Sequence, residues 1–151
     1  MCPALKVTRG PAARLLERNQ NQAWGAMAEG IKTVLIADDE PTVANTLRMI
    51  LESAGYRTIV AHDGHEAARL IREAGPDAVL LDVILPRIDG VEVAIQACRT
   101  APNCKVVLFS GRPDAADLLA AARVRGYSFE ILAKPARPQE LLEKLRDVLV
   151  R

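Results

Sequence analysis

Five short apolar runs alternate with longer segments of helical periodicity from residue 33 to the end of the chain. A run that is apolar at nearly every position predicts a strand covered on both faces, whereas apolar residues every three or four positions predict a helix. The predicted strands are Thr33–Ala37, Thr58–Ala61, Ala78–Leu81, Lys105–Phe109 and Phe129–Ala133. The helices that follow them begin near Pro41, after Gly64, after Gly90, near Asp114 and near Pro138.

This alternation through short loops favours parallel strand pairing with right-handed crossovers. Strands that are apolar throughout belong in a sheet with helices on both faces. We therefore expect an α/β fold with a doubly wound, five-stranded parallel sheet. There is no internal repeat, and only Arg151 follows the last predicted helix, so we expect no additional domain.

The first 30 residues depart from this pattern. They carry four basic against two acidic residues and include a polar run over residues 19–22. We expect residues 1–30 to be a flexible leader, with a short helix possible over Ala12–Arg18, and residues 31–151 to form the folded domain. Met27 is an alternative start, and N-terminal sequencing would show whether residues 1–26 belong to the native protein.

The charge balance argues against binding to nucleic acid or to an anionic membrane. Twenty basic against 19 acidic residues give a net charge of +1, which provides no field for holding nucleic acid or an anionic membrane. No apolar run reaches the 18 or so residues of a membrane span. The three cysteines lack metal-site spacing, so we expect reduced thiols and a cytoplasmic protein.

Polar side chains follow four of the predicted strands. They are Asp38 and Asp39, Asp82, Ser110, and Lys134. Because ligands of open parallel sheets bind at the carboxyl ends of the strands, we expect these side chains to meet at one edge. Three carboxylates favour a hard cation such as Mg²⁺. Asp82 could then form an aspartyl phosphate, with Lys134 and the Ser110 hydroxyl binding the phosphoryl oxygens.

Four segments carry a resemblance to a known family: Val34–Glu40, Leu80–Gly90, Phe109–Gly111 and Lys134–Pro135. Together they resemble the receiver domain of two-component response regulators, the CheY-like superfamily, over about residues 33–150. The resemblance implies a flavodoxin-like sheet with strand order 2-1-3-4-5.

By this resemblance, Asp82 is the phosphoacceptor and takes its phosphoryl group from a sensor histidine kinase or a phosphotransfer protein. Mg²⁺ would be held by Asp39 directly, by Asp38 mainly through water, by Asp82, and by the backbone carbonyl of Ile84.

Ser110 would be the hydroxyl that closes on the phosphoryl group, and Lys134 would pair with Asp82 and then with a phosphoryl oxygen. The resemblance also implies a cis Lys134–Pro135 peptide bond.

Phosphorylation would bias the face made by the fourth helix, fifth strand and fifth helix, which would bind a downstream protein or a second copy of the chain. Such a protein is a stand-alone signalling domain that catalyses only its own phosphorylation and dephosphorylation.

The sequence departs from the family at Ile131, where an aromatic residue commonly couples to the switch hydroxyl. Phe129 shares the sheet face of Ile131 and could substitute, although packing in the core is the simpler interpretation. Ile84 and Arg112 could tune the phosphoryl lifetime, with a solvated loop cation as the alternative for Arg112.

Two other functions stay open. A Mg²⁺-dependent phosphohydrolase would use Asp82 as its nucleophile, but Ile84 stands where such enzymes often carry a second acid. A degenerate receiver acting as a constitutive scaffold is disfavoured because all five site residues are intact. DNA binding is nearly excluded, because no helix-turn-helix or basic stripe follows the domain.

Overall fold

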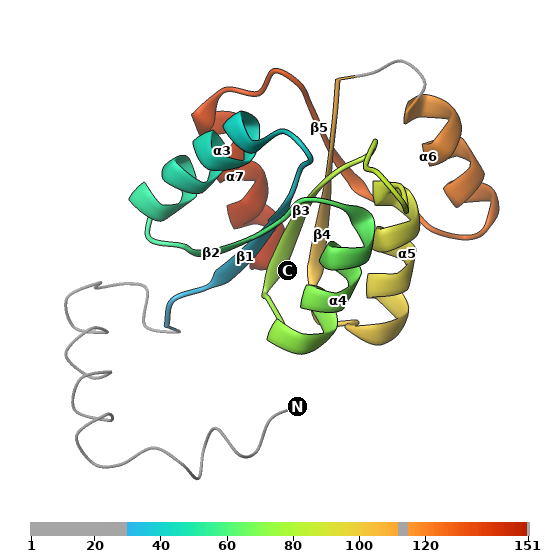
Figure 1. The fold of residues 1–151 in the computed structure, drawn as a ribbon, viewed down its shortest axis with the longest axis horizontal. Coiled ribbons are helices and arrows are strands. Elements are labelled where there is room, and N and C mark those ends of the chain that lie inside the picture. Colours follow the sequence, from blue (N-terminus) through green and yellow to red (C-terminus); the bar gives the residue numbers. More distant parts are fainter. Residues whose placement is uncertain (1–29, 112–114, 151) are drawn as a thin grey trace, which may run out of the picture. The chain divides into compact units, whose positions relative to one another are not determined.

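The computed structural model describes residues 30–111 and 115–150, in which strands and helices alternate along the chain (Figure 1). The elements are β1 (Thr33–Ala37), α3 (Pro41–Ser53), β2 (Arg57–Ala61), α4 (Gly64–Ala74), β3 (Ala78–Asp82), α5 (Gly90–Thr100), β4 (Lys105–Ser110), α6 (Ala115–Val124), β5 (Glu130–Ala133) and α7 (Pro138–Leu149). Each strand begins and ends within one residue of its prediction. Residues 1–29 of the predicted leader lie outside the described residues.

The five strands form one parallel sheet in the order β2-β1-β3-β4-β5, as the resemblance implies. Three aligned pairs define the register across its centre: Ile36 with Leu80, Asp82 with Phe109, and Phe109 with Leu132. Each crossover runs through a helix, because parallel neighbours cannot be joined by a tight turn.

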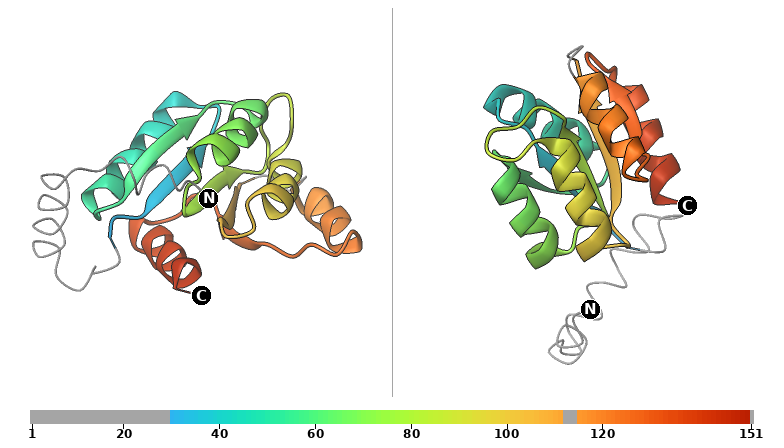
Figure 2. Two further views of the ribbon diagram at one scale, coloured as in Figure 1. Left: turned by 90° about the horizontal axis from the view of Figure 1, so that it is seen from below. Right: turned by 90° about the vertical axis from the view of Figure 1, so that its right-hand side faces the viewer.

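Helices cover both faces of the sheet, in agreement with the apolar character of the strands (Figures 1 and 2). On one face, α4, α5 and α6 pack on a core that includes Leu35, Leu81 and Leu108. On the other face, α3 and α7 pack on a core that includes Ile36, Leu80 and Phe109. These buried residues are aliphatic except for Phe109.

An aspartate caps the N-terminus of α4 and another caps that of α5. Asp63 accepts a hydrogen bond from the Glu66 N–H at the start of α4 (2.8 Å), and Asp89 accepts one from the Glu92 N–H at the start of α5 (2.9 Å). Such caps satisfy backbone donors that the helix itself cannot pair. None of the described helices is long and apolar enough to cross a membrane.

Candidate functional site

The carboxyl ends of β1 and β3 bring three acidic side chains together. Asp82 is the last residue of β3, and Asp38 and Asp39 follow β1 directly. Alternation along a strand places Asp38 on the same face as Ile36 and Asp82 on the same face as Leu80. One carboxylate oxygen from each of Asp38, Asp39 and Asp82 lies within 4.8 Å of the others. The acidic cluster predicted from the sequence is therefore present.

Lys134 reaches this cluster from the end of β5. Its Nζ donates to Asp82 Oδ2 at 2.9 Å and to Asp38 Oδ2 at 3.3 Å. Asp38 is only 1% exposed, so a paired cation is needed to offset its burial. The Lys134–Pro135 peptide bond is cis, as predicted.

The segment after Asp82 is fixed by its own backbone. The Ile84 N–H donates to Asp82 Oδ1 at 3.1 Å, and the Gly90 N–H donates to the Val83 carbonyl at 2.7 Å. A Cβ on Gly90 would stand 2.8 Å from the Asp82 carbonyl carbon. Only glycine lets the start of α5 approach Asp82 and Val83 this closely.

Burial and charge shift the titration of the two central groups. Burial raises the pKa of Asp82, and the Asp38 charge adds to this, although the Lys134 hydrogen bond and charge and the Ile84 N–H act in the opposite direction. Burial lowers the pKa of Lys134, but its contacts with Asp82 and Asp38 outweigh that effect and raise it. Lys134 is therefore cationic at neutral pH, and one ammonium faces three carboxyl groups.

Ser110 and Gly111 complete the edge of the site at the end of β4. The Ser110 carbonyl accepts a hydrogen bond from the Lys134 N–H at 2.8 Å, and Ser110 is aligned with Ala133. A Cβ on Gly111 would stand 2.9 Å from Lys134 Cβ, so the backbone of Gly111 lies directly against the lysine stem.

A groove of about 700 Å³ opens beside Asp82, between α3 and the segment after Lys134. Its acidic end is formed by Asp39, Glu40 and Asp82, and its apolar part includes Val43 and Ile50. The Asp82 carboxylate is therefore reachable from outside, along a surface that an apolar partner could contact.

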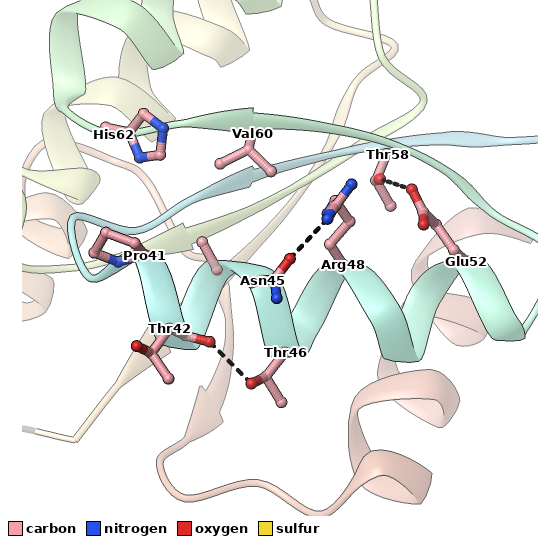
Figure 3. A pocket seen from close by; sticks show the side chains of 10 residues that line it. Pro41, Thr42, Asn45, Thr46, Arg48, Glu52, Thr58, Val60 and His62 are labelled. Carbon is pink, nitrogen blue, oxygen red and sulfur yellow. Dashed lines mark hydrogen bonds between the residues drawn. The ribbon is translucent and has the colours of Figure 1, made fainter.

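A second groove of about 730 Å³ runs between α3 and β2 (Figure 3). Two pairs of its polar side chains are hydrogen-bonded: Thr58 donates to Glu52 at 2.7 Å, and Arg48 donates to Asn45 at 2.7 Å. Among the described residues, the only group of metal-ligating side chains is the one at Asp82, so this second groove lacks comparable chemistry.

Two residues were considered for the role of the aromatic switch residue, Ile131 and Phe129, and their surroundings differ. Ile131 is 37% exposed on β5. Phe129 precedes β5, packs against the core under α4 and α5, and stacks on Tyr127 with ring centroids 6.2 Å apart. This packing favours the core interpretation of Phe129. Arg112 lies outside the described residues.

The sequence did not predict that Phe109 belongs to the site, although its ring centroid lies 4.9 Å from Lys134 Nζ. Because its side chain is apolar, Phe109 was interpreted only as a strand residue that packs in the core. The available signal was the strand order: with β4 between β3 and β5, a lysine that follows β5 must cross β4 to reach Asp82.

Comparisons with known proteins agree on one family. The model of the response regulator receiver domain matches residues 34–146. The response regulator MprA of Mycobacterium ulcerans is 35% identical over 118 residues, which cover 78% of this chain and 50% of that protein. MprA of Mycolicibacterium vanbaalenii is 36% identical over 118 residues, with the same coverage. The chain thus spans about half the length of the curated relatives it matches.

Solved structures give the same result. A receiver domain protein from Clostridium thermocellum superposes with a TM-score of 0.73 at 26% identity, covering 80% of this chain and 96% of that one. A CheY-like receiver domain protein from Methanospirillum hungatei superposes with a TM-score of 0.71 at 25% identity, covering 80% and 95%.

Proposed function

Because the chain belongs to the family of response regulator receiver domains, we propose that it signals by accepting a phosphoryl group on Asp82. The observation that carries this proposal is the Asp82 carboxylate held by Lys134 at 2.9 Å beside two further carboxylates. The donor would be a sensor histidine kinase or a phosphotransfer protein. We place this reaction in the cytoplasm, consistent with the free thiols of Cys98 and Cys104.

The donor set fits Mg²⁺. Asp38, Asp39 and Asp82 offer hard oxygen ligands within 4.8 Å of one another, and a single ammonium leaves their charge incompletely balanced. With the backbone carbonyl of Ile84 these residues would hold the ion. When bound, Mg²⁺ supplies charge neutralisation for the oxygens of the transferred phosphoryl group.

In the proposed reaction, an Asp82 oxygen forms a bond to phosphorus as the phosphorus–nitrogen bond of the donor phosphohistidine breaks. The electron pair of that bond stays on the imidazole. Lys134 moves its hydrogen bond from the carboxylate to a phosphoryl oxygen, and the Ser110 hydroxyl donates to another. The acyl phosphate is later hydrolysed, which returns the carboxylate.

Phosphorylation replaces the single negative charge of the Asp82 carboxylate by about 1.5 to 2 negative charges on three phosphoryl oxygens. We propose that the response reaches the face made by α6, β5 and α7. This face carries exposed apolar residues, Val124 at 88% and Ile131 at 37%, and only Ala115 and Ala122 are buried on α6. A helix with few buried contacts moves at low cost. A downstream protein or a second copy of the chain would bind there.

Acetyl phosphate tests the acceptor function without any partner. We expect wild-type protein to gain one phosphoryl group with Mg²⁺ and almost none after chelation, as measured by intact-protein mass spectrometry. No modification with Mg²⁺, and none with a competent kinase, would contradict the proposal. Multiple turnover of a small phosphate ester would instead support the phosphohydrolase.

The groove beside Asp82 provides a separate test of how a protein donor approaches. Thr46 is exposed on α3 and lines both this groove and the groove between α3 and β2, whereas Met49 is exposed on the same helix and lines neither. We expect Thr46→Arg to slow transfer from a phosphohistidine protein on the order of tenfold, because a long cation would obstruct an apolar contact surface. Labelling by acetyl phosphate should stay within about twofold of wild type, since a small donor needs no docking surface.

Met49→Arg is the matched control, with the same added charge on the same helix. Equal slowing of protein-donor transfer in both variants would indicate a general charge effect, and an unchanged rate in Thr46→Arg would exclude this groove as the approach route.

A further inference from the structure

The aromatic ring of Phe109 lies under the ammonium of Lys134. The distance from Lys134 Nζ to the ring centroid is 4.9 Å. The sheet register explains this position, because Phe109 is aligned with Asp82 on one side and with Leu132 on the other. Lys134 stands two residues beyond Leu132, so its side chain crosses β4 on its way to Asp82.

The ring is packed in the core at this position. Phe109 is 5% exposed and packs in the core under α3 and α7. The part of it that is not covered by the core lines the groove beside Asp82. The backbone of Gly111 contacts the lysine stem, so the side chain of Lys134 has contacts both along its stem and at its ammonium.

The face of an aromatic ring carries negative electrostatic potential and attracts a cation within about 6 Å, more strongly when the pair is shielded from water. Lys134 is 25% exposed, so shielding is substantial. An aliphatic side chain would fill the same core volume but would leave the ammonium without this attraction. Phe109 is also the only aromatic residue among the buried hydrophobic residues that the structure describes.

We propose that Phe109 is a positioning residue for phosphoryl transfer, which acts by holding the Lys134 ammonium between Asp82 and Asp38. This inference rests on the proposed phosphoacceptor function of Asp82. Its distinctive consequence is that the electron density of the ring at position 109, and not its volume alone, sets how well Lys134 serves the reaction.

Fluorinated phenylalanine separates these two properties. The chain has only two phenylalanines, so a Phe129→Leu background confines a global replacement to position 109. Phenylalanine, 4-fluoro-, 3,5-difluoro- and 3,4,5-trifluorophenylalanine weaken the negative face of the ring in steps with little change in shape. We expect the initial rate of labelling by acetyl phosphate to fall stepwise, on the order of tenfold across the series. The midpoint of urea unfolding should stay nearly constant.

The outcomes distinguish the two proposals. Equal rates across the series, with normal labelling of the unfluorinated chain, would overturn the role of Phe109 and leave Asp82 as the acceptor. Rates that fall only in parallel with stability would identify a purely structural role, and would overturn the inference too.

A second measurement does not depend on phosphorylation. Protons above an aromatic face resonate upfield, and the chain has five lysines, so ¹³Cε labelling of lysine gives a readable spectrum. We expect the Lys134 ε-methylene signal to be shifted upfield in the wild-type protein and to return to the position of the other lysines in Phe109→Leu. A wild-type signal without this shift would contradict the contact even if the chain proved not to be phosphorylated.

Discussion

Asp82→Asn should remove phosphorylation by acetyl phosphate, with a loss on the order of a thousandfold or more in rate. The amide has no anionic oxygen to attack phosphorus, although it keeps nearly the same size. Its single oxygen can accept from the Ile84 N–H or from Lys134 but not from both, because these donors contact different oxygens of the wild-type carboxylate. Lys134 keeps Asp38 as a partner at 3.3 Å, so the fold of the site is expected to survive while the nucleophile is lost. Intact-protein mass spectrometry measures the result.

The same substitution should not weaken the fold. Burial raises the pKa of Asp82 in the folded protein above its unfolded value. Such a group ionises more readily in the unfolded chain, so at neutral pH its charge favours unfolding. Removing the charge should leave the free energy of unfolding unchanged or higher, as measured in urea.

Asp147→Asn supplies the matched control, because Asp147 is exposed on α7 and the charge change is the same. It should be phosphorylated like the wild-type protein. If Asp82→Asn were labelled at the wild-type rate, another residue would be the acceptor. Loss of labelling is informative only if Asp82→Asn is folded. The urea unfolding measurement tests whether it is.

Gly90→Ala should destabilise the protein by about 3 kcal/mol or more, at the upper end of the range for overpacking. Replacing glycine by alanine within a helix normally stabilises it by about 0.5 to 1 kcal/mol, so the sign is reversed here. The reason is the close approach of α5 to the end of β3, where a Cβ would stand 2.8 Å from the Asp82 carbonyl carbon and 3.0 Å from Val83 Cα. Backbone atoms of a buried strand cannot move aside cheaply.

Gly75→Ala is the comparison, because its Cβ would meet nothing within 4 Å but its φ of +57° is left-handed. It should cost only about 1 to 2 kcal/mol. Urea unfolding of both variants gives the two values. A Gly90→Ala protein as stable as Gly75→Ala would show that the start of α5 can shift, and that Asp82 and Val83 are less tightly fixed than the structure indicates.

Local sequence determined much of this protein. The continuous apolar runs such as Val34–Ala37 predicted strands covered on both faces, because a side chain at every position must be shielded from water. Such runs are followed directly by Asp38, Asp82 and Lys134. These residues were therefore predicted to lie at one edge of the sheet, since parallel strands end together. The order of the strands came from the family resemblance instead, because apolar character does not say which strands are neighbours.

Tertiary structure decided the features that depend on neighbours distant in sequence. Asp38 is buried and Asp39 is exposed although they are adjacent, because successive side chains leave the chain in different directions. Ile131 is 37% exposed on β5, which is an edge strand of the sheet. The ring of Phe109 meets Lys134 only because β4 lies between β3 and β5. The sequence by itself thus determined which residues reach the site, and the packing of the sheet determined which of them touch, because contacts across strands depend on register and order rather than on local propensity.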